Sequence, residues 1–182
     1  CSNDTPRAAF TPRELAELTI GFYRRNYIEG LFLSSGVFQS PDHTCEQMIE
    51  AWRLLREEYH FNGYIHAKAI PGADPRLIER LGLLADRLSV NSELPSEQSL
   101  SLLAPQNKKQ AILAPMGFIR KRRDEGEGAL MRQGTRTHFA PAGQSTQMIV
   151  GASPESDYQI MQLTEGLYRT YKLKRVFYSA YI

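Results

Sequence analysis

The chain has 182 residues, 42% of them hydrophobic and 23% charged, a composition typical of a globular domain with one sizeable core. The formal net charge of +2 is too small to indicate by itself a nucleic-acid or membrane partner. No apolar run reaches the roughly 20 residues that span a bilayer, and the first residues do not resemble a signal peptide. We therefore expect one cytoplasmic domain without a membrane partner.

Helix and strand signals alternate in the first part of the chain. Thr11 to Glu14 combines an N-cap hydroxyl, a proline and a carboxylate, which predicts a helix to about residue 25. An apolar run then ends in Ser34-Ser35-Gly36, as expected where a buried parallel strand reaches its polar carboxyl end. These residues either bind a carboxylate or ammonium group or form a tight turn. Thr44 and Gln47 form a candidate capping box for a second helix.

Residues 64–70 predict a second strand, in which His66 and Lys68 alternate with apolar residues. Both side chains point either into a barrel interior or into solvent. In an interior, Lys68 needs a partner of opposite charge, and Glu93 is the obvious one.

Residues 87–94 predict a third strand, after a helix that begins at Asp74-Pro75. Asn91 and Glu93 lie two positions apart and therefore share one face of this strand. Their arrangement suits hydrogen bonds to a ribose or an amino-acid head group, and a structural network has the same appearance.

A basic segment follows a predicted helix that starts near residue 96. Residues 118–140 indicate a helix end followed by a basic excursion. Its run of Arg120, Lys121, Arg122 and Arg123 is either a phosphate contact or a solvated helix face.

Two more strands are predicted near the carboxyl end of the sequence. Gln144 to Gly151 is a polar and then apolar strand whose final glycine permits close approach of a ligand. Ser153-Pro154-Glu155 is expected to cap the next helix, and residues 175–182 predict the last strand. On that strand Tyr178 either stacks on a base or packs against its neighbours.

Five strands alternating with helices, joined by short links, indicate a parallel sheet with crossover helices. The spacing between most strands is near the roughly 30 residues of a barrel unit. The sequence begins with a helix that lacks a preceding strand and ends on a strand. We therefore expect an α/β fold, a partial TIM-type (βα) barrel with parallel strands, truncated at both ends.

Long stretches of the chain resemble a bacterial family of radical S-adenosylmethionine proteins described as DNA modification or repair proteins. The resemblance covers nearly the whole sequence. It is carried by Ser2 to Ala8, Phe22 to Gly36, Gly63 to Gly72, Pro141 to Gly151 and Leu173 to Ser179.

The resemblance implies a partial (βα)6 barrel that binds S-adenosylmethionine on a 4Fe-4S cluster held by three cysteines. The reduced cluster cleaves the cofactor to a 5'-deoxyadenosyl radical, which abstracts hydrogen from a substrate. The cofactor-binding residues that it implies here are Ser34, Ser35, Gly36, Asn91, Glu93, Ile149, Gly151, Tyr178 and Ser179. The residues expected to face the substrate are His66, Lys68, Gln144 and Thr146.

The chain departs from the family at two places. The family often has two glycines and a glutamate where this chain has Ser34-Ser35-Gly36. The Cys-x-x-x-Cys-x-x-Cys cluster motif is missing, and the match begins just downstream of its place. Cys1 aligns with a usually basic position and Cys45 is expected to be a small buried side chain, so we expect no metal ligands in this chain. The chain alone is then expected to be inactive.

The implied partners are an electron donor for the cluster and a nucleic-acid substrate. Two other functions remain open at this point. One is a non-catalytic barrel module that binds nucleic acid through Arg120 to Arg123. The other is an ordinary barrel enzyme for a phosphorylated small molecule.

Overall fold

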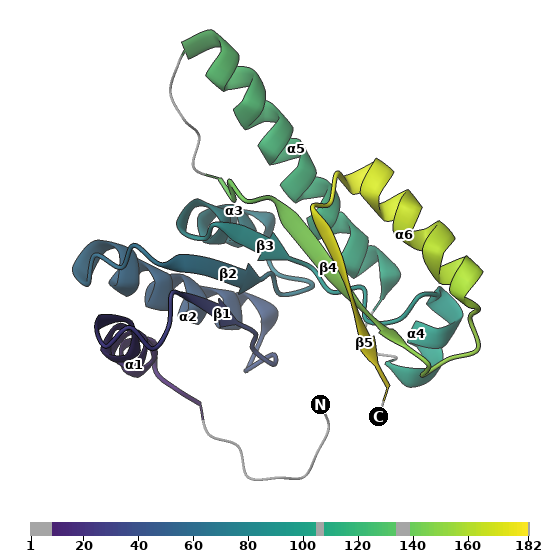
Figure 1. Ribbon diagram of the computed structural model, residues 1–182, viewed down its shortest axis with the longest axis horizontal. Helices are drawn as coiled ribbons and strands as arrows, with labels where there is room; N and C mark the ends of the chain where they lie inside the picture. The colour runs from purple at the N-terminus through teal and green to yellow at the C-terminus, as the bar shows by residue number, and fades with distance from the viewer. Residues whose placement is uncertain (1–8, 105–107, 134–138, 182) are drawn as a thin grey trace.

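The fold is a five-stranded, all-parallel sheet that curls into a half-barrel with helices packed against it (Figure 1). The computed structural model describes residues 9–104, 108–133 and 139–181. The strands follow the chain in order across the sheet, so every connection is a crossover. They are β1 (Gly30–Leu33), β2 (Tyr64–Lys68), β3 (Arg87–Ser89), β4 (Gln144–Val150) and β5 (Arg175–Ala180). This confirms the predicted parallel α/β architecture.

The helices lie on the convex side, so that α2 and α3 are behind β1 to β3 in Figure 1, and α6 runs beside β5. The helices are α1 (Pro12–Arg24), α2 (Pro41–Arg53), the π-helical turn η1 (Leu54–Glu58), α3 (Pro75–Leu84), α4 (Glu97–Leu103), α5 (Lys109–Gln133) and α6 (Asp157–Tyr171). Among the described residues, no helix combines the length and hydropathy of a membrane span.

Three of the predicted helix starts are confirmed, including that of α4 directly after Ser96, and two are wrong. Thr11 caps α1 in a capping box, and Asp74 caps α3 before its proline. By contrast, α2 starts at Pro41 under a Ser40 cap, because the Thr44 hydroxyl bonds the backbone of Phe38 instead. The α6 capping box likewise belongs to Ser156 and not to the preceding Ser-Pro-Glu segment.

The basic segment is a helix rather than the predicted helix end and excursion. Residues 109–133 form the single helix α5, with Pro115 inside it. Carboxylates one turn after the basic side chains explain this, because oppositely charged groups three or four positions apart stabilise a helix. Arg120 pairs with Asp124, and Lys121 pairs with Glu125. The part of the predicted segment at 134–138 lies outside the described residues.

Side-chain alternation divides the sheet into an apolar convex face and a polar concave face. Ile65, Leu88 and Met148 are completely buried and belong to one hydrophobic core with helix residues such as Trp52 and Leu81. Burying a side chain of this size contributes about 1.5–3 kcal/mol. The residues between them on the same strands point to the other face, so the core fixes which polar groups gather there.

Candidate functional site

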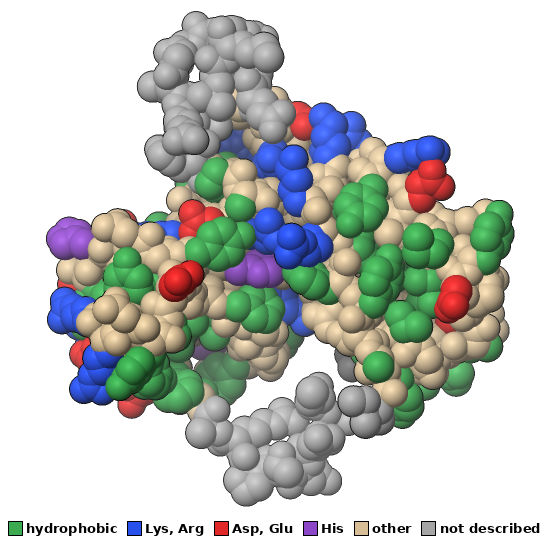
Figure 2. Space-filling model, in the orientation of Figure 1, with side chains coloured by type: hydrophobic (Ala, Val, Ile, Leu, Met, Phe, Trp, Pro, Cys, Tyr) green, Lys and Arg blue, Asp and Glu red, His purple; other side chains and the backbone are tan. Residues whose placement is uncertain are grey.

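The concave face of the sheet contains a hollow of about 310 Å³. Residues from all five strands or their carboxyl ends line it: Phe32, His66, Ser89, Asn91, Ser145, Thr146, Gln147, Phe177, Tyr178 and Ser179. Figure 2 shows Lys or Arg side chains and a histidine gathered over β2 and β3 in the middle of this face. Ligands of parallel α/β folds bind at the carboxyl side of the sheet, so this hollow is the candidate site.

Strand register arranges the polar side chains in rows across the sheet. Lys68 is paired with Ser89, Ser89 with Ser145, and Ser145 with Arg175. Residues paired in register share a face, so these four side chains form one row, which we call the serine row. Two residues nearer the amino ends of the strands, His66 is paired in register with Phe32 on one side and with Arg87 on the other. The ring centroids of Phe32 and His66 are 4.6 Å apart.

A second row, nearer the carboxyl ends, is joined by side-chain hydrogen bonds. Asn91 Nδ2 donates to Gln147 Oε1 over 3.5 Å, and Gln147 Nε2 donates to Ser179 Oγ. We call these three residues the amide ladder. It presents two amides and a hydroxyl, which together can donate and accept hydrogen bonds to a polar ligand.

Lys68 and Glu93 form the ion pair expected if both side chains face the interior. Lys68 Nζ lies 3.1 Å from Glu93 Oε1, and the two side chains are 18% and 27% exposed. Glu93 has a φ of 60°, in the left-handed region that side chains with a Cβ seldom adopt. Its backbone bonds Gln147 and Ile149 of β4, and its carboxylate reaches across to Lys68 at the end of β2.

Four buried polar atoms on the concave face have no hydrogen-bond partner among the described residues. They are His66 Nε2, Arg87 Nε, Ser89 Oγ and Ser145 Oγ. Burial, and secondarily the charge of Arg87, lower the pKa of His66 from 6.5 to about 4, so its imidazole is neutral at physiological pH. Buried polar groups in proteins are nearly always bonded, so these atoms indicate a place for a ligand.

Three predicted site residues direct their polar groups elsewhere. Gln144 Nε2 donates to the carbonyls of Met116 and Tyr171 and so ties α5 and α6 to β4. The Thr146 hydroxyl accepts from the Ser92 backbone amide, and the Tyr178 hydroxyl bonds Thr164 on α6. Thr146 and Tyr178 border the hollow, but their hydroxyls are already occupied by structural bonds.

The tips of β1 and β4 lie beside these rows and carry other predicted residues. Ser34 and Gly36 are exposed after β1, and the Ser35 hydroxyl bonds the Gly36 carbonyl. Ile149 is paired with Ser179, and Gly151 has a φ of 90°, a conformation that favours glycine. These backbone groups are therefore placed at the carboxyl edge, as predicted.

Glu155 follows β4 and is held by serines of α4 and its own loop. Burial alone would raise its pKa, but the neighbouring hydroxyls of Ser153, Ser96 and Ser99 outweigh burial and lower the pKa to about 2. Ser99 Oγ donates to Glu155 Oε1, whereas Glu155 Oε2 has no partner among the described residues. Glu155 is therefore an ionised carboxylate near the carboxyl end of β4.

The basic run of α5 lies among carboxylates. Arg122 bonds Glu79 and Glu125 in addition to the pairs made by Arg120 and Lys121. Arg123 also makes an interaction. This pairing weakens the positive field on which a nucleic-acid contact by residues 120–123 depended.

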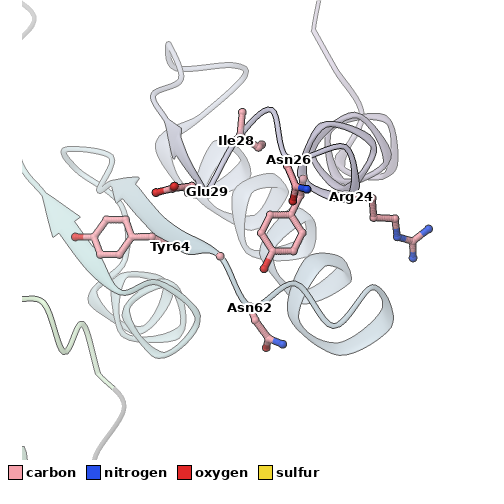
Figure 3. A pocket seen from close by; sticks show the side chains of 8 residues that line it. Arg24, Asn26, Ile28, Glu29, Asn62 and Tyr64 are labelled. Carbon is pink, nitrogen blue, oxygen red and sulfur yellow. The ribbon is translucent and has the colours of Figure 1, made fainter.

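A larger hollow of about 640 Å³ lies at the amino ends of β1 and β2. It is formed by the end of α1 and the loops before the two strands, and its lining residues Asn26, Glu29, Asn62 and Tyr64 are exposed. Figure 3 shows Arg24 directed away from Asn62 and Tyr64. Its residues contain no unpartnered buried polar side chain among those described, so we place the site on the concave face despite its smaller volume.

The described residues contain no ligand set for an iron–sulfur cluster. No group of three or more His, Cys, Asp or Glu side chains able to hold a metal occurs in 9–104, 108–133 and 139–181. Cys45 is fully buried on α2, as predicted, and burial raises the pKa of its thiol to about 12, so it is not a thiolate. Cys1 lies outside the described residues.

Sequence reasoning missed Arg87, Ser89, Ser145 and the two phenylalanines of the hollow. Arg87 and Ser89 share a face with Asn91 by alternation, a signal that the sequence already contained. On β4 the predicted residues Gln144 and Thr146 alternate with Ser145 and Gln147, and Thr146, Ser145 and Gln147 line the hollow whereas Gln144 does not.

No model of a known protein family matches the chain, and a search of curated proteins finds no significant relative.

Proposed function

We propose that the concave face binds S-adenosylmethionine and that the chain forms the half-barrel of a radical S-adenosylmethionine enzyme. The observation that carries the proposal is the amide ladder, which joins β4 and β5 to the segment that follows β3 at the carboxyl side of a parallel half-barrel. The proposed substrate class includes nucleic acid, as the resemblance implies.

The hollow supports this proposal through its size and its mixed lining. About 310 Å³ lies at the lower end of the roughly 300–1,000 Å³ typical of small-molecule sites. Phe32 and Phe177 supply aromatic surface, and Arg175 already lies 5.6 Å from the Phe177 ring centroid. Aromatic faces next to amides and hydroxyls suit a nucleoside, because its base stacks while its edges and ribose form hydrogen bonds.

Polar groups are available for both the ribose and the ammonium of the cofactor. Glu93 and Asn91 can accept and donate hydrogen bonds to ribose hydroxyls. The Ser34-Ser35-Gly36 segment after β1, in which Ser34 and Gly36 are exposed, offers carbonyl and hydroxyl groups to an ammonium. When bound, the cofactor supplies the group that abstracts hydrogen from the substrate.

The iron–sulfur cluster does not fit the described residues, because they contain no thiolate set. The proposal therefore assigns to this sheet the binding and orientation of the cofactor, and it assigns the cluster ligands to residues outside those described. The nucleic-acid-binding module is less well supported, because carboxylates accompany the basic run of α5.

Titration calorimetry with S-adenosylmethionine tests the proposal directly. We expect binding by the protein and a loss of up to about tenfold in affinity for Asn91→Ala, because one hydrogen bond contributes about 0.5–1.5 kcal/mol. Glu93→Gln should weaken binding by a similar factor. Asn62→Ala, which removes an exposed asparagine at the opposite edge, is the matched control and should bind as the parent does.

The proposal fails if the protein does not bind S-adenosylmethionine, or if Asn91→Ala and Asn62→Ala bind it equally well. Unfolding by urea identifies any variant that has lost its fold. A variant with parental stability and reduced affinity supports a ligand contact.

A further inference from the structure

The serine row is a second, deeper set of groups that the amide ladder does not use. Ser89 is 4% exposed and Ser145 is completely buried, yet neither hydroxyl has a partner among the described residues. Leaving a buried hydroxyl without a hydrogen-bond partner destabilises the folded state. Two unpaired buried hydroxyls on adjacent strands indicate that both form hydrogen bonds to a bound ligand.

The geometry of the row suits one small ligand that contacts both hydroxyls. Ser89 and Ser145 are paired in register, and neighbouring strands lie about 4.8 Å apart. Two donors at that spacing can reach two oxygens of a single phosphate or carboxylate. Arg87 precedes Ser89 by two positions and therefore points to the same face, with its Nε buried and unpartnered among the described residues.

The charge around the row favours an anion. Lys68 is neutralised by Glu93, whereas Arg87 and Arg175 have no carboxylate partner in the part of the chain that the structure describes. Both arginines are permanently charged, and a guanidinium binds the oxygens of phosphate and carboxylate strongly. The row thus combines two hydroxyl donors with an excess of positive charge.

We infer that the serine row, together with Arg87, binds an oxyanion group of the substrate, a terminal phosphate or carboxylate that reaches the floor of the hollow. The assignment to the substrate rests on the proposed function, in which the amide ladder holds the cofactor. The oxyanion site itself depends only on the residues of the row.

Titration calorimetry with inorganic phosphate, and separately with acetate, tests the inference and distinguishes the two anions. We expect Ser89→Ala and Ser145→Ala each to weaken binding of the preferred anion at least tenfold, because a hydrogen bond to a charged group is stronger than one between neutral groups. Arg87→Gln should weaken it further. The matched controls are Ser101→Ala on α4 and Arg169→Gln on α6, both exposed, and both should bind the anion as the parent does.

The imidazole of His66 gives an independent readout. It faces Phe32 of β1, Lys68 of its own strand, Arg87 of β3 and, through Lys68, the carboxylate of Glu93. An anion beside Arg87 favours the protonated imidazole, so the His66 resonances should titrate at higher pH when phosphate is bound. The two alanine variants should lose this shift.

Each outcome decides the inference. Equal anion affinity in the parent, the two alanine variants and the controls overturns it, as does the absence of binding. Competition between phosphate and S-adenosylmethionine assigns the row to the cofactor carboxylate and overturns the substrate assignment. Simultaneous binding of both supports the full inference, and phosphate binding without any cofactor binding supports the oxyanion site while refuting the proposed function.

Discussion

As the pH falls, protonation of His66 in the unfolded chain should destabilise the protein at a higher pH than protonation of the protein's carboxylates does. The imidazole has a pKa of about 4 in the folded state against 6.5 when exposed. The unfolded chain therefore takes up a proton as the pH falls through 6.5, and the folded chain does not until near 4. The contribution of His66 to stability is complete above pH 6.5 and is lost between those values. By about pH 5 the loss amounts to about 2 kcal/mol.

Urea unfolding measured from about pH 8 to about pH 5 tests this magnitude. The comparison is between the parent and His66→Asn, which cannot titrate, so the pH dependence of the variant should be weaker by about 2 kcal/mol. His60→Asn replaces an exposed histidine on the surface and serves as the control. If the parent and His66→Asn lose stability in parallel over this range, the buried neutral imidazole is the wrong explanation.

Three further predictions concern stability. Ser89→Ala and Ser145→Ala should raise the free energy of unfolding by about 1 kcal/mol in urea melts without ligand, because each removes an unpaired buried hydroxyl; a loss instead would indicate a structural bond. Arg56→Ala should cost about 3 kcal/mol in the same assay, because it leaves Asp86 part-buried without its ion-pair partner; a change within 0.5 kcal/mol, typical of surface positions, would contradict this. Glu155→Gln should remove stability that the parent has above about pH 4.5 and loses as the pH falls towards 2; identical acid-denaturation curves would refute the assigned pKa.

The order and type of most elements could be predicted from the sequence because local signals and tertiary packing agree there. Thr11-Pro12 and Asp74-Pro75 place a capping side chain directly before a proline, and both start helices in the structure. The second helix begins earlier than the Thr44 signal predicts, because Ser40-Pro41 supplies an equivalent cap and proline. The α5 helix was missed because its ion pairs, rather than apolar periodicity, support the basic run.

The site was harder to predict because a strand has two faces and sequence alternation does not say which one is buried. For β3 the apolar set was clear, so Asn91 and Glu93 were assigned to one face, and Asn91 lines the hollow with Ser89. For β4 both sets contain polar residues. Gln144 is buried against the helices only because α5 and α6 offer it two carbonyls, an arrangement that no local pattern reveals.

Glu93 combines an unfavourable left-handed backbone conformation with a favourable ion pair to Lys68. A glutamate in this conformation costs about 1–2 kcal/mol that a glycine would not. Glycine or asparagine would relieve this backbone cost, but either would leave the part-buried ammonium of Lys68 without its counter-ion, and that loss costs about 3 kcal/mol or more. A thermostability screen of this protein should therefore keep glutamate at position 93 in spite of its backbone, because the ion pair with Lys68 outweighs the conformational cost.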